Sequence, residues 1–221
     1  MSAKFVPATG WGRLLAWYDP AVAILTRERS CKRHLLESAQ LQPNMRVLDV
    51  GCGTGTLALA ALTQHPEVTV EALDIDSRVL DQAKRKPGST AVAWVQGNAS
   101  CLPHPSDSFD RVFCSLLFHH LTPEEKQHAA CEMRRVLTPS GRLLFADYGL
   151  PESVFAKLRF LTVRALDGWQ RTRCNVIGRI PDVLQAAGFG DVQQTLVLST
   201  LLGTLRCYVA QATQTQKVVS E

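Results

Sequence analysis

The chain has 221 residues, of which 20% are charged and 46% hydrophobic. These values are typical of a globular protein and exclude a fibrous or disordered chain. A single domain of this length buries roughly 70% of its unfolded surface, so it needs no disulfide or metal for stability. The formal net charge of +4 is mild, and the longest basic block is the triplet 84–86. We therefore expect no nucleic-acid partner.

Seven cysteines, without a Cys-x-x-Cys pair, predict reduced thiols rather than a disulfide framework or a zinc site. Proline and glycine interrupt the first residues before the apolar stretch of a signal peptide could form. No apolar run reaches the ~18 residues that span a bilayer. We therefore expect a cytoplasmic protein without a transmembrane segment, as a monomer or a homodimer.

The N-terminal region comes before the first predicted strand. It carries Trp11, Trp17 and Tyr18 and a helix-like stretch at 22–29. Because this region lies outside the strand and helix alternation that begins at Arg46, we expect it to form a helical cap over the carboxyl edge of the sheet.

A glycine loop follows the first predicted strand, 47–50, and opens an alanine-rich helix. Its glycines, Gly51, Gly53 and Gly55, let backbone approach a ligand at the helix N-terminus. The third glycine comes one residue too early for a dinucleotide fingerprint. The Gly-Lys-Ser/Thr of a triphosphate loop is missing as well. The spacing therefore disfavours both of these nucleotide classes.

Strand-like and helix-like segments then alternate, which predicts a parallel sheet with helices on both faces. After the first strand, we expect strands near 68–73, 91–95, 111–115 and 142–146. Thr122 supplies an N-cap hydroxyl, Pro123 a first-turn proline and Glu125 a capping-box carboxylate. These signals predict a helix from there to about Leu137, ended by 139–141.

The last part of the chain predicts two helices and a hairpin. The segment 151–169 predicts one amphipathic helix, and a short helix follows over 181–188. Strands at 192–199 and 205–210 predict an antiparallel hairpin about Gly203. The apolar residues at helical spacing in 151–169 are Val154, Phe155, Leu158, Leu161 and Leu166.

The run Val-Leu-Asp-Val-Gly-Cys-Gly-Thr-Gly at 47–55 resembles motif I of the class I S-adenosylmethionine-dependent methyltransferases. The Leu-Phe-His-His-Leu stretch at 117–121 is similar to the ubiquinone and menaquinone biosynthesis subgroup (methyltransferase type 11). The resemblance covers about 47–210. It implies an α/β Rossmann-like fold, with a mainly parallel seven-stranded sheet, a C-terminal antiparallel hairpin and helices on both faces. We expect one domain, made of a cap (1–42), a cofactor-binding core (43–148), lid helices (149–190) and the hairpin (191–212).

The resemblance also implies S-adenosyl-L-methionine as the cofactor. Asp49 would orient the glycine loop or the ammonium group, and Asp74 would accept from both ribose hydroxyls. Asp76 is the rival for the ribose, although it better suits the start of a helix. Asn98 stands where the family has an aspartate that accepts from adenine, and an amide oxygen can accept the same bond. The expected cofactor-binding residues are Tyr18, Asp49, Gly51, Cys52, Gly53, Asp74, Ile75, Asn98, Ala99 and Ser115.

Methyl transfer from a sulfonium needs a positioned acceptor and, for some acceptors, a base. His119 and His120 follow the fourth strand, and histidine side chains ordinarily titrate near pH 6.5, while Asp147 and Tyr148 follow the fifth strand. Of these we expect His119 and Tyr148 to be catalytic. By resemblance Tyr18 closes over the cofactor, and a packed aromatic in the cap is the alternative.

No metal is expected. His128 and Cys131 lie three residues apart on one predicted helix, without a third ligand nearby in sequence. Arsenic methylation would need a cysteine trio at the acceptor site. Cys101, Cys114 and Cys174 could form one, and placement in the core is the alternative.

The expected partner is a small, fairly apolar acceptor, because 151–169 lies where the family inserts its substrate lid. Ordinary core packing is the alternative for this helix. Two other classes stay open: a catalytically silent cofactor-binding module that acts through partners, and a nicotinamide oxidoreductase. A missing Tyr-x-x-x-Lys dyad counts against the second. Neither an Asn-Pro-Pro-Tyr motif nor a basic stripe favours methylation of nucleic acid.

Overall fold

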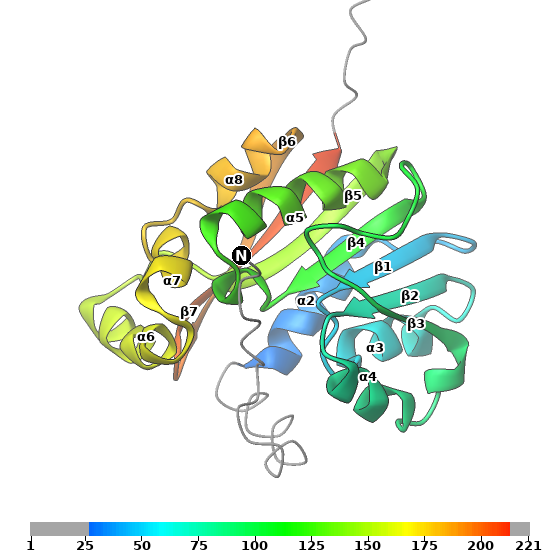
Figure 1. Ribbon diagram of the computed structural model, residues 1–221, viewed down its shortest axis with the longest axis horizontal. Helices are drawn as coiled ribbons and strands as arrows, with labels where there is room; N and C mark the ends of the chain where they lie inside the picture. The colour runs from blue at the N-terminus through cyan, green and yellow to red at the C-terminus, as the bar shows by residue number, and fades with distance from the viewer. Residues whose placement is uncertain (1–26, 213–221) are drawn as a thin grey trace, which may run out of the picture.

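The computed structural model describes residues 27–212, which form a seven-stranded sheet with helices on both faces (Figure 1). The strand order is β3-β2-β1-β4-β5-β7-β6. β1 to β5 are parallel neighbours, whereas β7 pairs antiparallel with β5 and β6 antiparallel with β7. The strands are β1 (Arg46–Val50), β2 (Thr69–Asp74), β3 (Val92–Gln96), β4 (Phe109–Ser115), β5 (Leu137–Tyr148), β6 (Phe189–Thr200) and β7 (Gly203–Ala212). The predicted fold is confirmed.

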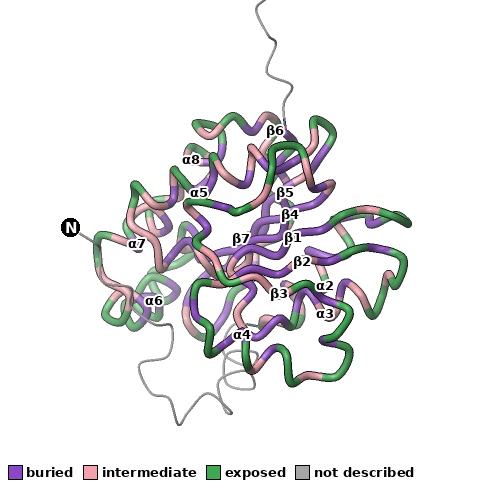
Figure 2. Tube along the Cα trace, turned by 45° about the vertical axis from the view of Figure 1, so that its right-hand side comes forward, coloured by how far each residue is buried: buried purple, intermediate pink, exposed green. Residues whose placement is uncertain are grey.

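The helices form two layers that enclose two apolar cores. Consecutive β1 residues face opposite cores, Val47 with α2 and α3, Leu48 with α5 and α8. Figure 2 shows the resulting concentration of buried chain in the central strands. The helices are α2 (Glu28–Ala39), α3 (Thr56–Gln64), α4 (Ser77–Lys84), α5 (Pro123–Val136), α6 (Val154–Asp167), α7 (Trp169–Val176) and α8 (Ile180–Ala186), with 3-10 turns η1 (Ser89–Ala91) and η2 (Phe118–His120). None of these helices is long and apolar enough to cross a membrane.

The capping box at the start of α5 is confirmed. Thr122 Oγ1 accepts from the Glu125 backbone N at 3.2 Å, and Glu125 Oε2 accepts from the Thr122 backbone N at 2.8 Å. The helix ends at Val136, within one residue of the predicted Leu137, but the predicted stop at 139–141 is wrong. Leu137 already pairs with Phe109 of β4, so 139–141 lies inside β5 rather than between a helix and a strand.

The described part of the N-terminal region lies on a face of the sheet, not over its carboxyl edge. Cys31 Sγ of α2 is 3.6 Å from Cys207 Sγ of β7, and Ala39 O accepts from Arg111 Nε of β4. Buried Leu35 of this helix joins the core. The segment 28–39 therefore belongs to one of the helix layers, because its apolar side chains pack into the core of the sheet. The predicted cap residues Trp11, Trp17 and Tyr18 lie outside the described residues.

The single helix predicted over 151–169 is two helices, because Gly168 with φ 96° ends α6 before α7 begins. The expected packing face is also different. α6 buries Ala156, Phe160 and Val163 against the protein. The apolar residues singled out in the sequence face solvent instead: Val154, Phe155, Leu158, Leu161 and Leu166.

Candidate functional site

The glycine loop connects β1 to α3 at the carboxyl edge of the sheet. Gly51, Gly53 and Gly55 all have positive φ (72°, 54° and 73°), a region that side chains rarely adopt. A Cβ at Gly55 would lie 2.2 Å from the Trp94 ring, and one at Gly51 would lie 3.0 Å from Leu117. A Cβ at Gly53 would meet nothing within 4 Å. The loop is therefore packed on protein at two glycines and open to a ligand at the third.

Asp74, the last residue of β2, anchors this loop. Its Oδ2 accepts from the Gly53 backbone N at 2.8 Å, and its Oδ1 from the Asp76 backbone N at 3.0 Å. Burial raises the pKa of Asp74, and the two amide bonds oppose that rise. Each carboxylate oxygen keeps a second lone pair, so Asp74 can accept further bonds from a ligand.

Asp76 has a structural role as the N-cap of α4, as the sequence predicted. Its Oδ1 accepts from the Arg78 backbone N at 3.0 Å, and its Oδ2 accepts from the Arg78 guanidinium at 2.7 Å. The Arg78 bond lowers the pKa of Asp76 despite partial burial. Its lone pairs are thus largely used within its own turn.

Asp49 places a buried carboxylate in β1, beneath the loop. Its side chain is 2% exposed, and Oδ2 has no hydrogen-bond partner in residues 27–212. Burial raises its pKa to about 7, against the charge of Lys32 and the backbone N–H of Ala58. A buried acceptor without a partner is costly, and a bound cation or donor would relieve that cost. The site therefore fits a ligand that carries an ammonium group.

The remaining cofactor candidates lie along the same edge. Ile75 is 42% exposed after β2, and Ala99 is buried after β3. Asn98 is exposed, and its Oδ1 already accepts from the Ser100 backbone N at 2.9 Å. Cys52 is buried in the loop, and half-buried Ser115 ends β4. Apolar and amide groups thus lie next to Asp74, in an arrangement suited to a planar base.

Leu116, which the sequence did not single out, lies between the glycine loop and the region around His119. Leu116 follows β4 with a φ of 58°, a left-handed conformation that costs a leucine about 1–3 kcal/mol. Its backbone N donates to Ala146 O of β5 at 2.8 Å. The turn sets Leu117 against Gly51 and leads directly into His119.

His119 and Asp147 form a buried pair at the carboxyl ends of β4 and β5. His119 Nδ1 lies 2.8 Å from Asp147 Oδ1, and Asp147 Oδ2 accepts from the His119 backbone N at 3.2 Å. Burial alone would lower the pKa of His119, but the charge and hydrogen bond of Asp147 outweigh it and raise that pKa. No residue of 27–212 hydrogen-bonds to His119 Nε2. Nδ1–H donation to Asp147 leaves Nε2 as an acceptor.

Helices α6 and α7, which make up most of the predicted lid, hydrogen-bond to this pair and to the neighbouring His120. Asn175 Nδ2 of α7 donates to Asp147 Oδ1 at 3.3 Å and to Tyr148 O at 2.8 Å. His120 Nδ1 lies 2.9 Å from Asp167 Oδ1 of α6. Burial and the neighbouring His119 lower the pKa of His120. Polar bonds therefore attach α7 to the pair and α6 to the adjacent His120.

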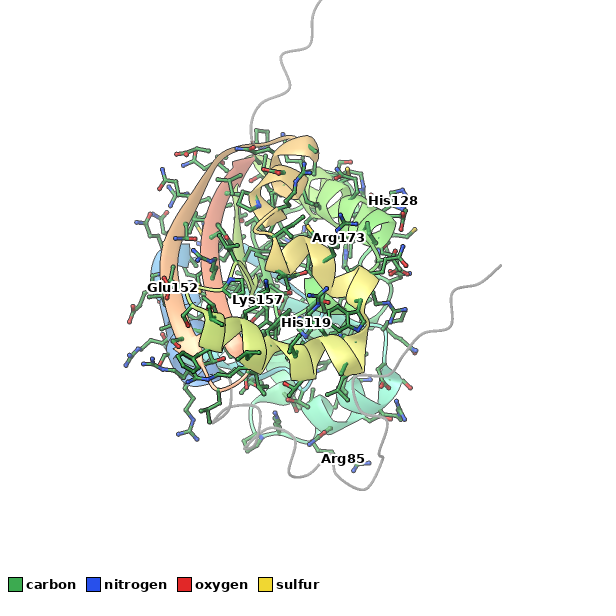
Figure 3. The ribbon with its side chains drawn as sticks, turned by 90° about the vertical axis from the view of Figure 1, so that its left-hand side faces the viewer. Arg85, His119, His128, Glu152, Lys157 and Arg173 are labelled. Carbon is green, nitrogen blue, oxygen red and sulfur yellow. The ribbon has the colours of Figure 1, made fainter. Side chains whose placement is uncertain are left out.

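Tyr148 lies between the pair and the lid. Its ring is buried, with its centroid 5.0 Å from that of His119 and 4.9 Å from that of Phe160 of α6. The other predicted catalytic residue thus contacts His119, and the wall of the site there is aromatic. Figure 3 shows His119 behind the lid helices.

A fully buried lysine of α5, Lys126, contacts α7. Lys126 Nζ donates to Arg171 O of α7, and burial lowers its pKa against the charge of Asp147. Lys126 shares a face of α5 with the apolar residues Ala129, Ala130 and Met133, and this spacing could have marked the lysine as inward-facing. Nothing local in the sequence could have paired Asn175 or Asp167 with residues near 120 and 147.

The structure brings together one group with metal-ligand chemistry in residues 27–212. The ligand atoms of His119, His120 and Asp167 all lie within 4.8 Å of one another. Each histidine Nδ1 already faces a carboxylate oxygen at hydrogen-bond distance. The trio Cys101, Cys114 and Cys174 forms no such group, and Cys114 is a core residue. His128 and Cys131 are exposed on α5.

Comparisons with known proteins agree with this geometry. Residues 47–141 match the family described as a methyltransferase domain. A demethylmenaquinone methyltransferase of Deinococcus radiodurans is 34% identical over 128 residues, 57% of this chain and 52% of that protein. A malonyl-[acyl-carrier protein] O-methyltransferase of Methylococcus capsulatus is 33% identical over 153 residues, 68% of this chain and 54% of the relative.

A solved structure of a SAM-dependent methyltransferase from Methanosarcina mazei has the same fold, with a TM-score of 0.65 at 21% identity. The match covers 81% of this chain and 97% of that one. The matched domain and these relatives confirm the predicted resemblance to the class I S-adenosylmethionine-dependent methyltransferases of the quinone-biosynthesis type. The chain spans about half the length of the two curated relatives described.

Proposed function

We propose that this protein transfers a methyl group from S-adenosyl-L-methionine to a small, fairly apolar acceptor molecule in the cytoplasm. The observation that carries the proposal is the His119–Asp147 pair. His119 follows two residues after Leu117, which packs on Gly51 of the glycine loop. A binding module needs the glycine loop, but it has no need of a buried, oriented base beside it.

The cofactor, when bound, supplies a methyl group on a positive sulfonium. On the cofactor side, we assign the ammonium group to Asp49 and the ribose to Asp74. Backbone at Gly51, Cys52 and Gly53 would line the methionine part. Ile75, Asn98, Ala99 and Ser115 would line the adenine end, and Tyr18 stays a predicted contact. The buried, unpartnered Oδ2 of Asp49 supports this direction of binding.

On the acceptor side, His119 Nε2 would take a proton from an acidic O–H or C–H group while Asp147 holds the imidazole. Asp147 stabilises the imidazolium that forms, which is reflected in the raised pKa of His119. Tyr148 and Phe160 would give the acceptor an aromatic wall. The two relatives are named for methylation of a demethylmenaquinone and for O-methylation of a malonyl group, so an ionisable carbon or oxygen acid is the acceptor class we favour.

The test has a binding part and a turnover part. Calorimetry with S-adenosylhomocysteine measures cofactor binding. Incubation of the protein with methyl-labelled donor and a metabolite extract, followed by mass spectrometry, detects a methylated product. We expect both binding and a labelled small molecule. Binding without any labelled product, over a panel of phenols, quinols and carboxylic acids, would favour the catalytically silent module instead.

A further inference from the structure

The outer face of α6 is apolar although it faces solvent. A surface helix normally turns its polar side outward, and here the opposite holds. Trp169, at the start of α7, and Leu150, just before α6, are also exposed. The apolar residues of the outer face are 38% to 82% exposed: Val154, Phe155, Leu158, Leu161 and Leu166. We call these five residues the outer face of α6.

The opposite side of α6 already packs on the protein. Phe160 contacts Tyr148 and lies over Gly203 of β7, and Ala156 and Val163 are buried beside it. The outer face is therefore a second apolar surface, beyond the one that holds the helix in place. Contiguous apolar surfaces of this kind mark sites where a protein meets another molecule or a membrane.

Cations border the outer face on both sides. Lys157 and Arg164 lie seven residues apart, on one side of the helix, and the Arg164 guanidinium stacks 3.9 Å from the Trp169 ring centre. Arg159 lies on the other side and donates to Thr200 O of the hairpin. An apolar strip between basic flanks, with an aromatic at its margin, is the pattern of helices that lie in the bilayer interface.

The wider segment has the same charge bias. Residues 150–179 contain six basic and two acidic residues, a net charge of +4 that equals the formal net charge of the whole chain. One of the two acids, Asp167, is already paired with His120. Figure 3 looks onto this side, where Lys157 of α6 and Arg173 of α7 lie in front. A flat anionic surface could meet α6 and α7 together.

We propose that the outer face of α6 binds the surface of an anionic phospholipid bilayer, with the helix axis parallel to the membrane. The apolar side chains enter the interface, and the flanking cations contact the lipid phosphates. This surface is distinct from the cofactor edge, and its binding needs no methyl transfer. Because Phe160 of the same helix packs on Tyr148, docking would also bring the acceptor side of the site next to the lipid.

The test is co-sedimentation of the full chain with vesicles of phosphatidylcholine, alone or mixed with phosphatidylglycerol. We expect binding to the anionic vesicles that weakens at high salt. Leu158→Ser should lower the partition coefficient roughly tenfold or more, because an exposed leucine is lost from the interface. Lys157→Glu should lower it roughly five- to thirtyfold.

The matched control is Arg85→Glu, which makes the same change in net charge at the end of α4, away from α6 (Figure 3). It should change the partition less than the α6 variants. Cofactor affinity and thermal unfolding of each variant verify that the fold is kept, since these side chains are exposed. Equal binding to neutral and anionic vesicles, or equal loss in Arg85→Glu and Lys157→Glu, would overturn the proposal. A dimer in light scattering that Leu158→Ser dissociates, without vesicle binding, would assign the face to a second copy instead.

Discussion

The two halves of the site are built in different ways. On the cofactor side, each predicted residue that the structure describes lies within a few positions of a strand end, and Asp74 bonds to a loop 21 residues away. On the acceptor side, Asp147 is bonded by His119 of η2 and by Asn175 of α7, each 28 residues away in the sequence. The difference teaches that the candidate donor site can be predicted from short motifs, whereas the candidate acceptor site depends on how α6 and α7 pack on the sheet.

The largest expected effect lies in the acceptor half. His119→Gln should lower kcat by roughly 10²–10⁴, because the proton acceptor is lost, while the affinity for S-adenosylhomocysteine stays within about twofold. Steady-state kinetics and calorimetry on the same preparation separate the two quantities. A matching loss of cofactor affinity would show that the two halves are not independent.

Asp147→Asn probes the same pair through pH. Asp147 raises the pKa of His119 above the ordinary histidine value near 6.5. In the unaltered protein the neutral imidazole that would act as the base therefore forms only at a pH above that value. Without the carboxylate, the rising limb of kcat against pH should move to lower pH while the plateau falls. A limb that stays in place in both proteins would assign the titration to another group.

The sequence predicted the mainly parallel sheet, the hairpin, the capping box and the role of Asp76 as a helix cap, because each depends on local pattern. It failed where an apolar pattern had two faces to choose from. Phe160 and Val163 and the outer residues Val154 and Leu158 all recur at helical spacing, and only the packed structure shows which side faces the core. Spacing also said nothing of Asn175, whose bonds to Asp147 and Tyr148 arise from tertiary contact alone.

A smaller effect separates the two acids of the cofactor half. Asp74→Ala should weaken S-adenosylhomocysteine binding by about 1–3 kcal/mol, since it removes both a ligand acceptor and the anchor of Gly53. Asp76→Ala is the matched control. It should cost about 0.5–2 kcal/mol of stability through the lost N-cap, with nearly unchanged affinity. Calorimetry together with chemical denaturation distinguishes the two, and the reverse pattern would transfer the ribose role to Asp76.

The last prediction concerns the proton on Asp49. Its pKa is about 7 in the folded protein and 3.8 in the unfolded chain, so the native state holds a proton that the unfolded state releases between these values. The free energy of unfolding should therefore fall as the pH rises through this window. Asp49→Asn should remove that part of the pH dependence, which denaturant titrations at several pH values would measure.

The same proton links Asp49 to the cofactor half. A bound ammonium favours the ionised carboxylate, so binding should release the proton below pH 7 and affinity should rise with pH by up to about tenfold per unit. Above pH 7 this dependence should level off. In Asp49→Asn only the ionisation of the ligand itself contributes to the pH dependence of binding, so this variant gives the baseline. If calorimetry in buffers of different ionisation enthalpy finds equal proton release in both proteins, Asp49 supports the loop only, and the ammonium group binds elsewhere.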